Sequence, residues 1–339
     1  MINIMTAPLA IIPKYLWTDI IGYLSLKNTI LLSQIHHQFD SIIDWKICFE
    51  KRLDGIVMVS GTRLDKVFGT VTSNANYNWK YACVTYTKCD NINGMFSKLQ
   101  ALPELKLDEV SYCQVFIKGG SYEYIVSYGD VFDMDGNDRC TQMNNGYMIE
   151  LIGNNNDNHR TSIYTSNISE HIATSIRINV SVTFSIIHID FVNVYCDFIN
   201  KNNVVNSVLI HDCSFIYNQD LVTCVGLQLK SIQNITITKC IFDLVKSALN
   251  VGIIVLPCGN NLNLKIADCQ FDNKTACYIV ENNVKICKVH IDFLRNTVRN
   301  ADNLFVTDYD LTDYINLSEN DYDNKITVCH NVRSTAHEN

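Results

Sequence analysis

A short apolar pattern recurs along the second half of the chain and constrains its fold more than any other feature. The pattern is apolar-x-apolar-x-x-apolar-x-apolar. Its copies begin at Ile187, Val208, Ile235, Leu264 and Val289, at spacings of 21, 27, 29 and 25 residues. Because each side of a coil is a short strand and the two-residue gap turns a corner, a period of this length is typical of one coil of a parallel β-helix.

Stacked coils place like residues in columns about 4.8 Å apart. The sixth and eighth positions of the pattern therefore predict an inward column of thiols beside an inward stack of rings. The thiols are Cys213, Cys240 and Cys269, and the rings are Phe215, Phe242 and Phe271. We expect the thiols to be buried and reduced. The outward position before each thiol holds Asp212, Lys239 and Asp268, whose charges alternate from coil to coil.

The composition fits a folded solenoid with unusual turns. Hydrophobic residues make up 47% of the 339 residues and charged residues only 18%, which favours a large core over disorder. Glycine and proline are scarce, with 14 and 4 residues, whereas asparagine numbers 38. Asparagine tolerates left-handed backbone better than other non-glycine residues, so we expect it to supply the turns. The net charge of −8 argues against nucleic acid as a partner.

Targeting and metal-binding signals are absent from the sequence. No apolar run approaches 18 residues and no basic leader opens the chain, so we expect no membrane partner and an intracellular, cytoplasmic protein. The 14 cysteines include no CxxC pair, and they lie in apolar strand-like runs. This pattern favours buried thiols in a reducing compartment, with no metal site and no cofactor.

The first 54 residues differ from the rest, because apolar residues recur there at helical spacing. The spacing predicts three small helices at roughly 14–24, 28–36 and 40–53. One interpretation is a helical cap on the larger domain. The other is a module whose exposed apolar face docks a partner.

The stretch 12–35 (IPKYLWTDIIGYLSLKNTILLSQI) closely resembles an F-box. It has a proline after an apolar residue, leucine and isoleucine on one face, a Tyr-Leu pair, a short link and a Leu-Leu-Ser run. The resemblance implies a three-helix module that binds Skp1, which in turn binds a cullin. The residues that the resemblance assigns to Skp1 binding are Pro13, Leu16, Ile20, Ile21, Leu24, Leu31 and Ile35.

Two later segments resemble the opening of right-handed parallel β-helix domains. They are 115–122 (VFIKGGSY) and 149–153 (IELIG). Together with the F-box-like stretch, they resemble the F-box proteins of animals and large DNA viruses that carry a C-terminal β-helix. We therefore expect an α+β multidomain chain. Its parts would be a helical module at 1–54, a linker that covers the solenoid edge at 55–110, and a right-handed parallel β-helix at 111–339.

The resemblance implies a substrate-recognition adaptor of a cullin-type ubiquitin ligase. The helical module would dock Skp1 and the β-helix would present an unidentified target protein. The second hypothesis is a viral structural or interaction protein that uses the F-box fold without ubiquitin. The third is a carbohydrate-active β-helix enzyme, which would need clustered carboxylates. Asp190 and Asp292 lie four coils apart by the repeat count, so we expect no carboxylate pair there and assign no catalytic residue.

Overall fold

The computed structural model describes most of the solenoid and parts of the N-terminal region. The described residues are 14–25, 27–29, 32, 52–63, 81–100, 102, 111–125, 147–156, 159–166, 174–180, 182–200, 206–218, 223–244, 249–257, 261–280, 288–307, 311–322 and 326–331. The expected second and third N-terminal helices lie largely outside them. The helices bounded within the described residues are α1 (Lys14–Tyr23), α5 (Ile92–Gln100) and the short 3-10 helix η3 (Thr312–Tyr314).

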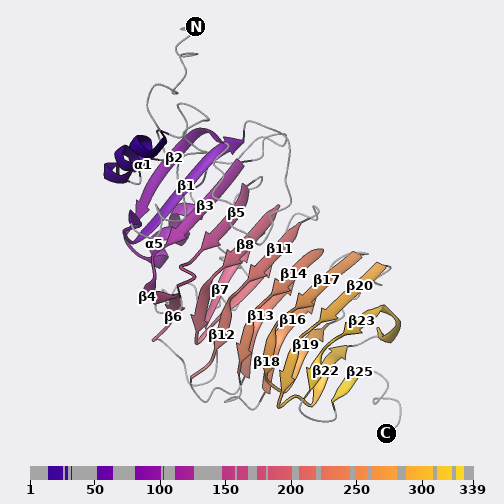
Figure 1. The fold of residues 1–339 in the computed structure, drawn as a ribbon. Helices are drawn as coiled ribbons and strands as arrows, with labels where there is room; N and C mark the ends of the chain where they lie inside the picture. Colours follow the sequence, from indigo (N-terminus) through magenta and orange to yellow (C-terminus); the bar gives the residue numbers. More distant parts are fainter. Residues whose placement is uncertain are drawn as a thin grey trace, which may run out of the picture.

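Residues from about 161 to 329 form a parallel β-solenoid of the right-handed type, as the repeat pattern predicts (Figure 1). Each coil gives one strand to each of three sheets. The first sheet, in spatial order, contains β2 (Tyr81–Cys89), β1 (Ile56–Arg63), β3 (Ser111–Ile117), β5 (Tyr147–Ile152), β8 (Thr183–Ile187), β11 (Ser207–His211), β14 (Asn234–Thr238), β17 (Asn261–Ala267), β20 (Lys288–Leu294) and β23 (Ile315–Ser318).

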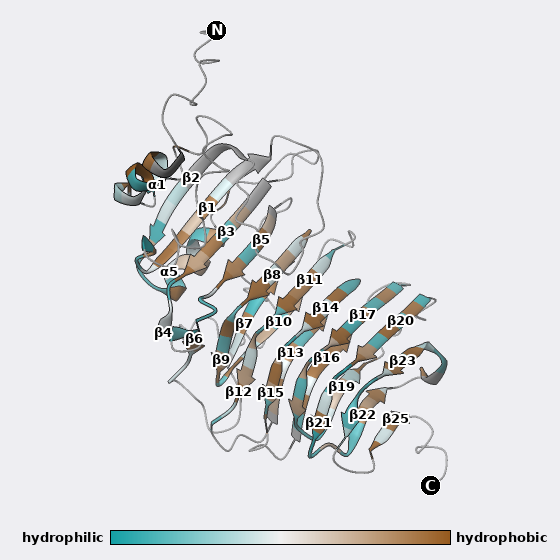
Figure 2. Ribbon diagram, viewed as in Figure 1, coloured by the Kyte–Doolittle hydropathy of each residue, from teal (hydrophilic) through white to brown (hydrophobic). Residues whose placement is uncertain are grey.

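The other two sheets repeat the same order of coils. The second sheet contains β4 (Gly120–Glu123), β6 (Thr161–Tyr164), β9 (Ile189–Val192), β12 (Ser214–Ile216), β15 (Ile241–Asp243), β18 (Gln270–Asp272), β21 (Thr297–Arg299) and β24 (Asp321–Tyr322). The third contains β7 (Thr174–Asn179), β10 (Val194–Ile199), β13 (Thr223–Lys230), β16 (Leu249–Leu256), β19 (Thr275–Ile279), β22 (Asn303–Thr307) and β25 (Thr327–Asn331). Figure 2 shows apolar and polar residues alternating along these strands.

The middle copies of the repeat pattern are in the predicted register, but the first and last are not. Val208 pairs with Ile235, which pairs with Leu264. Upstream, however, Val208 pairs with Phe184 rather than Ile187, and downstream Leu264 pairs with Ile291 rather than Val289. The true copies therefore begin at Phe184 and Ile291, and a further copy begins at Ile315, which pairs with Ile291.

The register also places the outward residues of the first sheet. Thr236 pairs with Lys265, which pairs with Asp292, and His290 lies opposite Asn263. Asp190 belongs to β9 in the second sheet, so it shares no column with Asp292 in the first sheet.

At the corner between the first and second sheets, the fifth position of the pattern holds a residue with left-handed backbone conformation. These residues have φ between 50° and 59° and none is glycine; they are His188, Asp212, Lys239, Asp268, Arg295 and Glu319. Five of these six corner N–H groups, all except that of Glu319, donate to a carbonyl of the next coil: Asp212 N–H, for example, donates to Thr238 O at 2.9 Å. This regular bond holds a backbone conformation that L-residues otherwise avoid.

The sixth position carries a ladder of side-chain hydrogen bonds. The thiols of Cys213, Cys240 and Cys269 are buried, as predicted, and form no disulfide. The Sγ atom of Cys269 lies 3.7 Å from Ile237 O in the preceding coil and accepts from Cys240 N–H at 3.4 Å. One coil later Asn296 takes the same place. Its Nδ2 donates to Ile266 O at 3.1 Å and its Oδ1 accepts from Cys269 N–H at 2.9 Å.

The shared bonding pattern predicts which substitutions Cys269 tolerates. Cys269→Asn should leave stability within about 1 kcal/mol of the wild type, because asparagine supplies the donor and the acceptor that the column uses. Cys269→Val should cost about 1–3 kcal/mol, because it leaves the buried Cys240 N–H and Ile237 O without this partner. Urea midpoints measure both, and equal midpoints for the two variants would contradict the ladder.

The predicted ring stack is present and extends by one coil upstream. Phe215 and Phe242 have ring centroids 5.1 Å apart, and Phe242 and Phe271 have centroids 4.8 Å apart. Phe191 continues the stack upstream at 5.2 Å from Phe215. Downstream, Val298 takes the place opposite Phe271, and the tilted ring of Phe293, from the first sheet, lies 5.7 Å from Phe271. All five rings are buried in one continuous core.

At the N-terminal end of the solenoid, an antiparallel hairpin extends the first sheet and a helix packs on the core. Strand β1 pairs antiparallel with β3, and β2 pairs antiparallel with β1. Helix α5 buries Ile92, Met95, Phe96 and Leu99 in the same core that contains the first coil. Figure 1 shows α1 beyond this hairpin, beside β2.

Candidate functional site

Helix α1 carries three of the residues that the F-box resemblance assigns to Skp1 binding, namely Leu16, Ile20 and Ile21. Leu16 and Ile20 are separated by four positions, so they share one face of the helix. They are 41% and 43% exposed, respectively. Two branched apolar side chains exposed one turn apart form a small apolar strip that is available to a partner.

The remaining predicted partner-binding residues divide into two groups. Ile21 is only 3% exposed and therefore packs inward, and Leu24 is half-buried just after the helix. Pro13, Leu31 and Ile35 lie outside the described residues. The apolar strip that faces solvent is therefore Leu16 and Ile20, whereas Ile21, about 100° further round the helix, faces inward.

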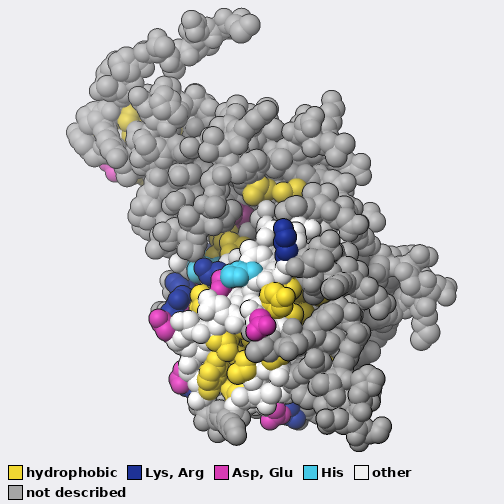
Figure 3. Space-filling view, turned by 90° about the vertical axis from the view of Figure 1, so that its right-hand side faces the viewer, with side chains coloured by type: hydrophobic (Ala, Val, Ile, Leu, Met, Phe, Trp, Pro, Cys, Tyr) yellow, Lys and Arg dark blue, Asp and Glu magenta, His cyan; other side chains and the backbone are white. Residues whose placement is uncertain are grey.

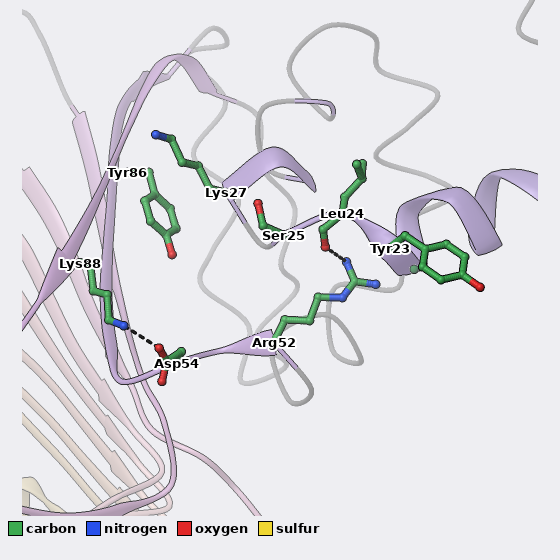
Figure 4. Close-up of a pocket in the computed structure, with 9 residues that line it drawn as sticks. Tyr23, Leu24, Ser25, Lys27, Arg52, Asp54, Tyr86 and Lys88 are labelled. Atoms are coloured by element: carbon green, nitrogen blue, oxygen red, sulfur yellow. Dashed lines mark hydrogen bonds and ion pairs between the residues drawn. The ribbon is translucent and has the colours of Figure 1, made fainter.

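A cavity of about 500 Å³ opens at the C-terminal end of α1 (Figure 4). One wall comes from the segment that follows the helix, and the other comes from the end of the β1–β2 hairpin and the chain that precedes it. The lining residues are Gly22, Tyr23, Leu24, Ser25, Lys27, Arg52, Asp54, Tyr86 and Lys88. Tyr23 is 93% exposed at the rim, so the cavity adjoins an aromatic surface.

Three cations and one carboxylate line this cavity, so its formal charge is positive. Arg52 Nη1 donates to Leu24 O and to Thr29 Oγ1, both at 3.1 Å, and ties the end of α1 to the chain before β1. Lys88 Nζ lies 2.6 Å from Asp54 Oδ2. This bond lowers the pKa of Asp54 and raises that of Lys88, so the pair stays ionised. Lys27 adds a third cation from the α1 side.

The sequence did not reveal this positive cavity. Arg52 and Leu24 are 28 residues apart in sequence, and Lys88 follows Asp54 by 34. Nothing in the local pattern of either segment indicates that they meet. Lys88 reaches Asp54 because β2 pairs antiparallel with β1, which places the end of β2 beside the residues that precede β1.

A second group of ionisable residues links three coils of the solenoid. We call it the Arg160 cluster; it contains Arg160, His188, Asp190 and Asp212. Arg160 Nε donates to both Asp190 oxygens at 3.1 Å, while Nη2 donates to Asp212 O at 2.8 Å. His188 Nδ1 lies 2.7 Å from Asp212 Oδ2. The repeat pattern predicted no pair of neighbouring carboxylates, whereas in the structure Asp190 and Asp212 both bond the guanidinium of Arg160.

The Arg160 cluster acts as a clamp because its charged groups bond one another. Hydrogen bonding from His188, together with the charge of Arg160, lowers the pKa of Asp212 to about 2 despite partial burial. The neighbouring His211 has its pKa lowered, first by burial, and lies 2.8 Å from Thr238 Oγ1. The cluster contains two carboxylates, one arginine and one histidine, so it has no surplus of positive charge with which to bind an anion.

The lowered pKa of Asp212 predicts an acid-sensitive contribution to stability. The folded-state pKa lies below the ordinary value, so the contribution is complete above about pH 4 and is lost as pH falls toward about 2. Since the side chain is one-third exposed, we expect about 1 kcal/mol after allowance for solvent screening. Asp212→Asn should lose this amount at pH 6 and show a smaller drop between pH 4 and 2. Urea unfolding measures the effect.

The control for this prediction is Asp243→Asn, at an exposed position of β15. It should change neither the stability at pH 6 nor the acid dependence. An unchanged acid dependence in Asp212→Asn would show that the Arg160 cluster contributes nothing to the pH dependence of stability.

The predicted alternation of charge along the corner column is present in the structure. Arg295 pairs with Asp268 through two hydrogen bonds, at 2.7 Å and 2.9 Å. The pKa of Asp268 is lowered mainly by this pair, with a smaller contribution from Lys239 in the preceding coil. The alternation of charge continues to Glu319. The pKa of Arg295 is raised mainly by Asp268, with a smaller contribution from Glu319.

In the part of the chain that the structure describes, no group of three or more histidine, cysteine, aspartate or glutamate residues is placed to hold a metal ion. Nor does any helix among the described residues have the length and hydropathy needed to cross a bilayer. Comparisons with models of protein families, with curated proteins and with solved structures find no match.

Proposed function

We propose that this protein is a substrate-recognition adaptor of a cullin-type ubiquitin ligase, which docks Skp1 through α1 and presents a target on its solenoid. The observation that carries the proposal is the exposure of Leu16 and Ile20 on one face of α1. These are two of the residues at which the stretch 12–35 resembles an F-box. A face that served only internal packing would bury them.

The positive cavity extends this docking surface. It begins at Gly22 and Tyr23, directly after the turn that carries Ile20. Its surplus of cations over Asp54 favours a partner with acidic side chains beside its apolar contact. We therefore propose that Skp1 contacts the apolar strip of Leu16 and Ile20 and places acidic groups near Lys27.

The solenoid would then act as a rigid arm. Its three sheets share one continuous core, so a target bound to one coil keeps a fixed position relative to the coils beside it. An adaptor of this kind needs no chemistry of its own, because it raises the effective concentration of the target near the ubiquitin-charged enzyme.

Affinity purification of the full chain from host cells tests this proposal. Recovery of Skp1 together with a cullin would support the adaptor. Recovery of structural partners without Skp1 would instead favour the second hypothesis, a docking protein that works without ubiquitin. Binding of purified Skp1 to the purified chain, measured by calorimetry, distinguishes direct contact from capture within a larger complex.

A further inference from the structure

The C-terminal end of the solenoid differs from the N-terminal end, because its last described coil leaves core positions exposed. In the first sheet, Leu317 pairs with Phe293. Phe293 is fully buried, whereas Leu317 is 36% exposed. Tyr322 pairs with the buried Val298 and is itself only half-buried. The inward columns therefore reach the surface at this end.

Within the described residues, the three sheets end at β23, β24 and β25, and no described strand pairs with the outer edges of these three strands. Arg295 N–H donates to Ser318 O and Asn296 N–H donates to Asn320 Oδ1. In the next coil, the corresponding N–H groups of Glu319 and Asn320 have no described acceptor. An open edge beside exposed apolar side chains is a template for an added strand.

The charge of this end indicates what kind of segment fits. Residues 308–324 contain six acidic residues and neither lysine nor arginine. Of the acids whose positions are described, Asp321 pairs with Arg299 of the coil before, whereas Asp313 and Glu319 are exposed. Two copies meeting end to end would bring these acidic segments together, which disfavours a second copy as the occupant.

Figure 3 faces the right-hand side of Figure 1, where the C-terminal coils lie, and shows hydrophobic side chains among acidic, basic and histidine side chains. The exposed apolar residues of the last coil include Tyr314 at 49%, Leu317 at 36% and Val328 at 39%. An extended segment that alternates apolar and basic residues would place apolar side chains over Leu317 and basic ones near Glu319.

We propose that the C-terminal end of the solenoid binds an extended, basic segment of a partner protein as an added β-strand. This goes beyond the Skp1 proposal and does not depend on it, because the surface lies at the opposite end of the solenoid from α1 (Figure 1). Backbone hydrogen bonds to the open edge would provide register, and the acidic residues would select basic side chains.

The test uses the full chain and a fluorescein-labelled peptide, Lys-Val-Lys-Val-Thr-Val-Lys, with a matched peptide that carries glutamate in place of lysine. We expect the basic peptide to raise fluorescence anisotropy saturably and the acidic peptide to bind about tenfold more weakly or not at all. Leu317→Lys should reduce affinity for the basic peptide by about tenfold or more. Ile241→Lys, at another exposed apolar position on β15, should bind like the wild type.

Several outcomes would overturn the proposal. One is the absence of binding, and another is equal binding of the two peptides or of the wild type and Leu317→Lys. Self-association of the wild type, abolished by Leu317→Lys in analytical ultracentrifugation, would assign the end to a second copy. If removal of residues 332–339 were required before the peptide bound, the chain's own C-terminus would be the occupant. Circular dichroism confirms that the variants are folded.

Discussion

Leu16→Asp should reduce binding of Skp1 by about 100-fold or more and leave the solenoid folded with an unchanged melting temperature. The reason is that Leu16 is 41% exposed, so a carboxylate there is solvated in the free protein. In a docked complex, the same carboxylate would be removed from water against an apolar partner, which costs several kcal/mol. Titration calorimetry with purified Skp1 measures the affinity, and circular dichroism follows the melting of the solenoid.

Two further substitutions on α1 make this result interpretable. Asp19→Asn changes an exposed residue next to Ile20 without placing a charge in the apolar strip, so it should bind like the wild type. Ile21→Asp places a charge at a buried position and should disrupt the helix itself. Equal Skp1 binding by Leu16→Asp and the wild type would remove the main support for the ligase proposal.

The solenoid was predictable from the sequence because its coils repeat the same physical problem. Each coil must bury an apolar side chain at the eighth position, and Phe215, Phe242 and Phe271 mark that position plainly. The pattern failed at both ends of the run for different reasons. At the upstream end, the strand has buried apolar residues on both of its faces, and Ile187 is itself buried on the outer face. A copy of the pattern that begins at Ile187, three residues after the true start at Phe184, therefore also fits the sequence.

At the other end the pattern failed because an asparagine occupies the thiol column. A search for apolar residues at the sixth position rejects Asn296 and selects Leu294 instead, which shifts the copy by two residues. In the structure, however, Asn296 is 1% exposed and makes the hydrogen bonds that the thiols make in earlier coils. Hydrogen-bonding equivalence between cysteine and asparagine is not visible in an apolar pattern.

The candidate docking site was predictable only in part. The spacing of Leu16 and Ile20 indicates a shared helix face, and the structure shows that this face is exposed. The cations of the adjoining cavity and the Arg160 cluster were not predictable. Arg160 reaches Asp190 across 30 residues and Asp212 across 52. Such contacts depend on how the coils stack, which the local sequence does not encode.

The ring stack carries the largest expected effect on stability. Phe242 is fully buried between Phe215 and Phe271 and also packs against the backbone of the third sheet. A Cβ atom at Gly226 would lie 2.7 Å from Phe242 Cδ1, so the ring occupies the space that a side chain would need. The glycine and the ring therefore fix each other's positions in adjacent coils, and the surroundings have little freedom to collapse if the ring is removed.

Phe242→Ala should therefore lower the free energy of unfolding by about 3–5 kcal/mol. The loss combines the burial of the ring, its two offset contacts and a cavity that the rigid coils on either side do not fill. Urea unfolding of the full chain, followed by circular dichroism, measures the change.

Ile241→Ala is the matched control, because Ile241 precedes Phe242 in β15, points outward and is 40% exposed. It should cost less than about 0.5 kcal/mol. Equal losses for the two variants would show that the aromatic column does not support the solenoid, and that its stability comes from the hydrogen-bonded ladders alone.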